Sequence, residues 1–153
     1  MEELIEVVFE EEYKHFRVSE LSNFLYYVKI VYTLLMTSPY LLEYKKEISI
    51  NEVKKIAYKI KEEILSKKLI FPRYYYKKYL LFKKNLWDED VFIVKIHKKS
   101  PLTIWFMGVT IFLTVCFALS GGEIEVCAVP PKIKIKMRSL GEGIKKIKEA
   151  MRY

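Results

Sequence analysis

The sequence predicts an α+β protein in which a small basic domain precedes one apolar helix of the transmembrane type and a short strand–helix tail. Three observations support this prediction. Residues 101–120 carry no charged side chain, and the segments on either side show strand-like and helix-like hydrophobic patterns. The net charge is +8 for the whole chain, and the part beyond residue 12 is more basic still, because the first twelve residues carry six glutamates and no base. The predicted parts are a basic domain over 1–100, a membrane helix over 101–120 and a basic tail over 121–153.

The basic domain is predicted to start with a strand and two helices. Residues 4–9, LIEVVF, are apolar and β-branched, as strands prefer. From Ser19 to about Thr37, apolar residues recur at spacings of three and four, which predicts a helix. A second amphipathic helix is expected after Ser49, which could form a capping box with Glu52.

Strand patterns follow on both sides of the apolar segment. Residues 74–84 and 91–98 are predicted to form a hairpin, and the second strand is apolar on both faces, as in a largely covered strand. Residues 132–138, KIKIKMR, alternate with period two, so their apolar side chains share one face. Ser139 and Glu142 then fit a capping box that opens a short basic helix.

The apolar segment has the length and the boundary residues of a membrane helix. Twenty helical residues extend about 30 Å, which matches the hydrocarbon core of a bilayer. Pro101 suits the first helical position, and Gly121 can adopt the left-handed conformation that ends a helix. Lys95, Lys98 and Lys99 precede the segment, and the ten residues after it contain no base. The positive-inside rule therefore predicts a single-pass protein of the cell membrane with residues 1–100 in the cytoplasm.

A buried location for the same segment stays open as an alternative. Only 33 residues follow residue 120, too few for a comfortable core of their own. The strand at 132–138 also needs a partner, and the hairpin at 74–98 would lie across the membrane. In the alternative, residues 101–120 form a central core helix, and the strand joins the hairpin in one sheet.

One stripe of the apolar segment is a candidate surface for self-association. Its residues are small or weakly polar and recur at helical spacing: Thr103, Met107, Thr110, Thr114 and Ala118. Such stripes let helices approach closely in lipid and exchange hydrogen bonds. The alternative is that each threonine bonds to the backbone of its own helix.

A second candidate site interleaves bases with aromatic rings. It comprises Arg73, Tyr74, Tyr75, Tyr76, Lys77 and Lys78. Cations on phosphates and rings stacked on bases are typical of nucleic-acid surfaces, and anionic lipid headgroups would suit the same residues. The alternative is a strand whose tyrosines cover the core and whose lysines face water.

No catalytic, cofactor or metal motif is recognisable, so we expect a protein that binds rather than catalyses. Function is predicted to be that of a membrane-anchored binding or assembly module with membrane lipid as one partner. A homo-oligomer through the apolar helix and a protein or nucleic-acid partner are further expectations. The alternatives are a soluble basic nucleic-acid-binding module and a small membrane-perturbing, pore-like effector. The absence of glutamine and the abundance of lysine, glutamate and isoleucine resemble the composition of thermophile proteins.

Overall fold

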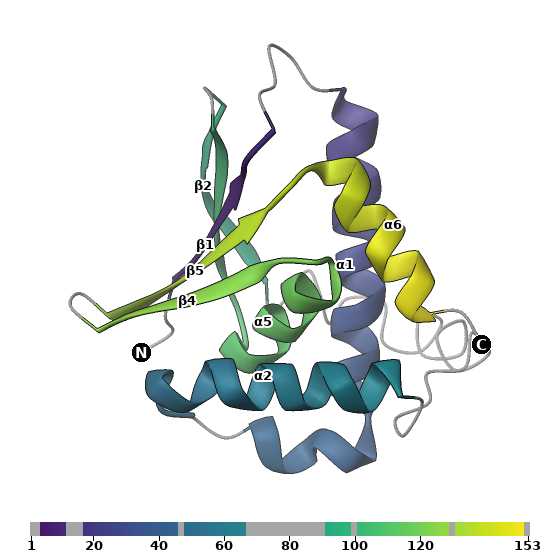
Figure 1. The fold of residues 1–153 in the computed structure, drawn as a ribbon, viewed down its shortest axis with the longest axis vertical. Coiled ribbons are helices and arrows are strands. Elements are labelled where there is room, and N and C mark those ends of the chain that lie inside the picture. Colours follow the sequence, from purple (N-terminus) through teal and green to yellow (C-terminus); the bar gives the residue numbers. More distant parts are fainter. Residues whose placement is uncertain are drawn as a thin grey trace.

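The computed structural model contains one five-stranded mixed sheet with helices packed against it, which confirms the predicted α+β class. It describes residues 4–11, 17–45, 48–66, 91–98, 101–128 and 131–151. The strands are β1 (Ile5–Phe9), β2 (Phe92–His97), β3 (Leu102–Met107), β4 (Glu123–Ala128) and β5 (Pro131–Met137). Their order in the sheet is β2-β3-β1-β5-β4 (Figure 1).

The first strand of the chain is the central strand of the sheet. β1 pairs antiparallel with β3 and parallel with β5, so Val7 lies between Ile104 and Ile135. The outer strands β2 and β4 each form an antiparallel pair with the neighbour that follows them in sequence. The sheet therefore combines strands from residues 1–100, from 101–120 and from 121–153.

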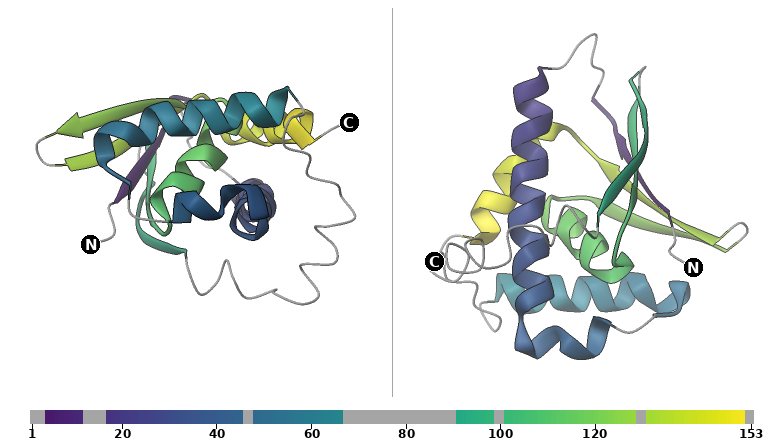
Figure 2. Two further views of the ribbon diagram at one scale, coloured as in Figure 1. Left: turned by 90° about the horizontal axis from the view of Figure 1, so that it is seen from below. Right: turned by 180° about the vertical axis from the view of Figure 1, so that it is seen from behind.

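The helices of the described chain pack against one face of this sheet (Figures 1 and 2). They are α1 (Val18–Thr37), a 3-10 helix (Pro39–Lys45), α2 (Ile50–Leu65), α5 (Thr110–Leu119) and α6 (Leu140–Met151). On β1, Ile5, Val7 and Phe9 are fully buried beneath the helices, whereas the alternate residues are partly exposed. On β5, the buried residues are Ile133, Ile135 and Met137, as the alternation predicts. The apolar core lies between these side chains and the helices.

The helix starts agree only in part with the predicted caps. α1 begins at Val18, one residue before the predicted cap Ser19, and neither its own cap residue nor Ser49 before α2 makes a side-chain capping bond. At α6, the Glu142 amide donates to the Ser139 hydroxyl over 3.0 Å, which is half of the predicted capping box. The last helix is thus capped as expected, and the first two begin without a side-chain cap.

The prediction of one continuous apolar helix over residues 101–120 is wrong. Residues 102–107 form β3, which is hydrogen-bonded on both sides, and the helix α5 begins only at Thr110. Leu102, Ile104 and Phe106 point into the core. A short apolar run fits a strand and a helix equally well, so its composition does not decide between them. Hydrogen bonding to a strand on each side favours the strand here.

Helix α5 is apolar on all sides because protein surrounds it. It packs against α1, α2 and α6 and against the sheet, and its residues from Ile111 to Leu119 are all buried. A buried helix is what the second interpretation of this segment expected, although that helix covers only ten of the residues. Within the ranges that the structure describes, no helix combines the length and the apolarity needed to cross a membrane.

Two glycines end α5 in the manner expected from the sequence. Gly121 has a φ of 85°, the left-handed conformation that glycine adopts without strain. The Gly121 amide donates to the Ala118 carbonyl over 3.1 Å, and the Gly122 amide donates to the Phe117 carbonyl over 2.9 Å. This pair of bonds is a Schellman motif, which satisfies the last carbonyls of the helix and turns the chain into β4.

Another glycine brings α6 close to α1. A Cβ atom added to Gly143 would lie 2.7 Å from Phe24 Cε1 and 3.1 Å from Met137 Cε, whereas one added to Gly141 would have no neighbour within 4 Å. We therefore expect Gly143→Ala to lower the free energy of unfolding by about 1–3 kcal/mol through overpacking. Gly141→Ala is the matched control and should raise it by up to about 1 kcal/mol through helix propensity. Urea denaturation followed by circular dichroism measures both, and equal effects of the two changes would contradict the packing shown here.

Candidate binding surface

The face of the sheet opposite the helices is the principal candidate site, because no described helix covers it. Residues directly opposite each other on neighbouring strands share a face, so the strand register assigns each side chain to one side. We call this side the uncovered face. Its apolar half lies on β1, β2 and β3 and comprises Val8, Phe92, Trp105 and Met107. Its charged half lies on β1, β4 and β5 and comprises Glu6, Glu123, Glu125, Lys132, Lys134 and Lys136.

Strand β2, at the edge of the described sheet, is the most exposed apolar element of this surface. All six of its residues are exposed, with 56% of Phe92, 51% of Val94, 40% of Ile93 and 36% of Ile96 accessible to solvent. The prediction of a largely covered strand is therefore wrong within the described residues. The second strand of the predicted hairpin, 74–84, lies outside those residues, and the described partner of β2 is β3.

A bulge in β2 changes which of its residues share a face. Ile93 lies opposite Phe106 and Lys95 lies opposite Trp105, so Val94 is an extra residue between them. As a result, Ile93 and Ile96 both lie on the helix-covered side of the sheet, although simple alternation places them on opposite sides. Neither is buried, and no helix within the described ranges extends closely over this edge.

A cation–π contact joins β2 to β3 on the uncovered face. The Lys95 ammonium lies 5.2 Å from the centroid of the Trp105 ring. Such a contact is worth about 0.5–1 kcal/mol at an exposed site. It draws the lysine side chain inward over β3, away from the outer edge of β2. The apolar residues of the edge therefore remain accessible beside it.

The charged half of the uncovered face is a ladder of alternating charges. Lys132 Nζ donates to Glu6 Oε2 over 3.4 Å, and Lys136 Nζ donates to Glu125 Oε1 over 2.9 Å. The hydrogen bond from Lys136 lowers the pKa of the Glu125 carboxyl, and the same bond raises the pKa of Lys136. The stabilisation from Glu125 is lost as the pH falls through its lowered pKa, and that from Lys136 is lost as the pH rises through its raised pKa. Because three glutamates and three lysines neutralise each other here, the charged half carries no surplus charge to attract an anion.

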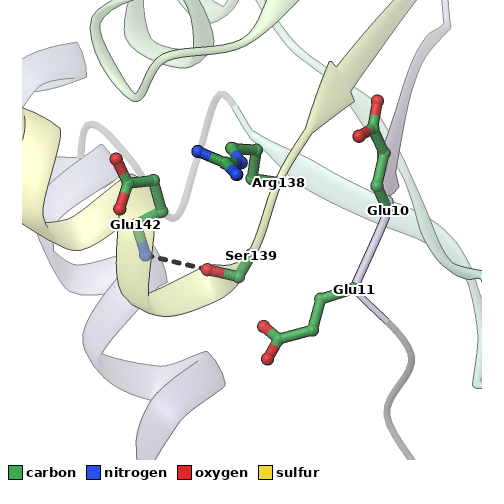
Figure 3. A pocket seen from close by; sticks show the side chains of 5 residues that line it. All are labelled: Glu10, Glu11, Arg138, Ser139 and Glu142. Atoms are coloured by element: carbon green, nitrogen blue, oxygen red, sulfur yellow. Dashed lines mark hydrogen bonds between the residues drawn. The ribbon is translucent and has the colours of Figure 1, made fainter.

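A separate depression of about 510 Å³ lies where the parallel strands β1 and β5 end (Figure 3). The Glu10 amide donates to the Met137 carbonyl over 2.7 Å and the Glu11 amide donates to the Arg138 carbonyl over 2.9 Å, which places the residues after each strand side by side. The lining residues are Glu10, Glu11, Arg138, Ser139 and Glu142.

The groups around this depression do not converge on one point. Figure 3 shows the Glu10, Glu11 and Glu142 carboxylates spread around it, and the Ser139 hydroxyl is occupied by the Glu142 amide. Among the described residues, no three histidine, cysteine, aspartate or glutamate side chains are placed to share a metal ion. An open depression lined by carboxylates and one guanidinium suits water or ligands of mixed charge. It therefore indicates no particular reaction or class of ligand.

The structure separates the residues of the predicted threonine stripe. Thr103 lies on β3, where its hydroxyl donates to the Pro101 carbonyl over 3.2 Å, whereas Thr110, Thr114 and Ala118 lie on α5. Thr114 and Ala118 are fully buried, and the Thr114 hydroxyl donates to the Thr110 carbonyl over 2.7 Å. Met107 also lies on β3, so the five residues do not form one face of one helix. Thr114 bonds to the backbone of its own helix, as the alternative interpretation expected. The other predicted site, Arg73 to Lys78, lies outside the described residues.

Sequence reasoning did not single out Trp105 and Phe92 as surface residues. The signal was the alternation within LTIWFM, which places every second residue on one face of a strand. Because both alternating sets are apolar, this pattern was hidden within the longer apolar run. The exposure of Phe92 had no local signal at all.

The two cysteines are expected to differ sharply in reactivity. Cys116 is fully buried, its thiol donates to the Val28 carbonyl over 3.7 Å, and burial raises the pKa of this thiol well above its usual value. Cys127 is partly exposed on β4. We expect iodoacetamide to label one thiol in the native protein and two in urea, as counted by mass spectrometry, because only a thiolate at the surface reacts readily. Rapid labelling of both in the native state would contradict the burial of α5.

Comparison with known protein families, curated proteins and solved structures found no match to this chain. Its function is therefore inferred from the surfaces described above.

Proposed function

We propose that this protein is a non-enzymatic binding and assembly module that engages another macromolecule through β2 and the apolar half of the uncovered face. The observation that carries the proposal is the exposure of four apolar side chains on one edge strand, from 36% at Ile96 to 56% at Phe92. Exposed apolar edge strands are ready templates for pairing, and natural proteins usually protect them. An apolar edge therefore fits a partner that covers it.

The composition of this surface favours a protein partner. Phenylalanine, tryptophan and methionine are enriched at protein interfaces, and Phe92, Trp105 and Met107 lie together on the uncovered face. An extended segment added beside β2 would gain backbone hydrogen bonds, and its side chains would contact those of the edge. The backbone hydrogen bonds and the side-chain contacts would therefore both form along β2.

Site-specific photo-crosslinking tests this function. We expect benzoylphenylalanine at position 92 to give a defined covalent adduct when the full chain is expressed in its host. The matched control carries the same group at Tyr26, which is 50% exposed on α1. An adduct that forms at position 92 and not at position 26 supports the proposal. Equal or absent adducts at the two positions would contradict it.

Binding of single-stranded nucleic acid is a second candidate function, favoured by the contact between Lys95 and Trp105. A lysine beside a partly exposed aromatic ring suits phosphates and stacked bases, and the chain carries a net charge of +8. We expect the affinity for a single-stranded oligonucleotide to fall with salt, and Trp105→Leu to cost about 1–3 kcal/mol of binding. Fluorescence anisotropy measures both. Binding unaffected by Trp105→Leu would reject a role for this face.

Two expectations from the sequence require residues 101–120 to enter a membrane, namely the membrane anchor and the pore-like effector. In the described structure residues 101–120 contain β3 and α5, so neither expectation supports the proposal above. Both stay predictions. Carbonate extraction of expressing cells tests the anchor, and dye release from liposomes tests the effector.

A further inference from the structure

The two outer strands of the described sheet, β2 and β4, differ in polarity, and this difference indicates what binds to β2. β4 alternates exposed glutamates, Glu123 and Glu125, with buried or half-buried apolar residues, and α2 packs beside it. Among the described helices none packs closely beside β2, and the one lysine of β2, Lys95, lies over the Trp105 ring. The described sheet therefore has one polar edge and one apolar edge, as expected when only the second is an interface.

Because of the bulge, the sides of the sheet on which successive β2 side chains lie form a symmetrical sequence. From Phe92 to His97, the register with β3 places side chains on the uncovered, covered, uncovered, uncovered, covered and uncovered sides, with Val94 and Lys95 both opposite Trp105. This order is the same in both directions, with its centre between Val94 and Lys95. A regular six-residue strand alternates strictly and lacks this property.

We propose that two copies of this chain pair antiparallel through β2 about a twofold axis between Val94 and Lys95, an inference that rests on the proposed assembly function and names its partner. In this arrangement Ile93 lies opposite Ile96 of the second copy on the helix-covered side. Phe92 lies opposite His97 of the second copy on the uncovered side. The two sheets become one, and the two apolar halves become neighbours.

Charge selects this register over its neighbours. A shift by one residue in one direction places Lys95 directly opposite Lys95 of the second copy, and like charges directly opposite each other are destabilising. A shift in the other direction places Ile93 opposite Lys95 and mixes the two faces. In the proposed register Lys95 lies opposite Val94, and its ammonium is drawn toward Trp105 of its own chain.

The same features limit the assembly to two chains. Twofold pairing uses each apolar edge once, and the remaining outer strand β4 carries exposed glutamates. An isologous contact of this kind closes on itself and does not continue into a fibre. The bulge also shortens the pairing strand, which discourages extended edge-to-edge association.

Light scattering on the full-length chain gives the first test. We expect a mass of twice 18.3 kDa for the native protein at micromolar concentration. Ile93→Lys with Ile96→Lys should weaken dimerisation by about tenfold or more, equivalent to about 1.4 kcal/mol. Leu65→Lys is the matched control, since Leu65 is 47% exposed on α2, and it should leave the dimer unchanged. Unchanged circular dichroism shows that each variant is folded.

Disulfide trapping tests the register independently. In a Cys127→Ser background, Ile93→Cys with Ile96→Cys should give a covalent dimer on mild oxidation, because these positions lie opposite each other in the proposed pair. Phe92→Cys with Ile96→Cys is the control, and it should trap much less because these positions lie on different faces. Equal trapping by both pairs overturns the register.

The outcomes separate this inference from the proposed function. A single-chain mass at all concentrations overturns the dimer. If position 92 still crosslinks to another protein, the assembly function stands with a different partner. If the chain is monomeric and the β2 amides are nevertheless protected from hydrogen exchange without a crosslink to another molecule, the chain covers its own edge and both proposals fail.

Discussion

Truncation of Phe117 to alanine is expected to lower the free energy of unfolding by about 3–5 kcal/mol, the cost of deleting a buried aromatic ring. Phe117 is fully buried on α5, and its ring centroid lies 5.0 Å from that of Phe106 and 6.3 Å from that of Phe24. The variant therefore loses contacts with both β3 and α1. Urea denaturation in aqueous buffer, followed by circular dichroism, gives the value.

Phe92→Ala is the matched control for this prediction. Phe92 is 56% exposed, so its truncation should change stability by no more than about 0.5 kcal/mol in the monomer. A loss below about 1 kcal/mol for Phe117→Ala would mean that this ring does not lie in a packed interior. That outcome would favour the membrane interpretation of residues 101–120, which stays a prediction.

Gly122→Ala is expected to cost about 3 kcal/mol, at the upper end of the usual range for overpacking. An added Cβ would lie 2.5 Å from Ile135 Cγ2, 2.8 Å from the Phe117 carbonyl oxygen and 2.9 Å from Met137 Sδ. A carbonyl of the helix cannot move aside as the end of a flexible side chain can. The substitution therefore forces α5 and the sheet apart, and thermal denaturation should show a large fall in Tm.

The neighbouring glycine provides the control for Gly122. At Gly121 an added Cβ would meet only Lys146 Cγ at 3.4 Å, so Gly121→Ala carries mainly the cost of a left-handed conformation, about 1 kcal/mol. The expected order of destabilisation is Gly122 well above Gly121. A reversed order would contradict the close approach of α5 to β5.

Local patterns predicted most of the elements but not the arrangement of the sheet. The spacing of apolar residues predicted α1, α2 and α6, apolar β-branched composition predicted β1, and alternation predicted β5, because these are local properties of the chain itself. That β1 lies between β3 and β5 depends on contacts between residues about 100 or more positions apart. No local pattern encodes such pairing. The same limit explains the error at 101–120, since pairing partners and not composition made Leu102–Met107 a strand.

The candidate surface was still harder to predict. The apolar faces of β2 resemble those of a covered strand, and only the end position of the strand in the described sheet shows that Ile93 and Ile96 are accessible. The bulge that places both on one side arises from the register with β3 and has no local signal. Trp105 lies within residues 101–120, and the apolar composition of that segment predicted a membrane helix. Exposure is a property of the assembled fold, and the sequence contains it only indirectly.

The central position of β1 has a consequence for biosynthesis. Both strands that flank it are translated much later, and β5 ends at residue 137. At about 5–20 residues per second, roughly ten seconds separate the emergence of β1 from that of β5. During this interval β1 leaves the ribosome without either of its neighbours, so the pairing of the sheet about β1 cannot be completed until β5 has been synthesised.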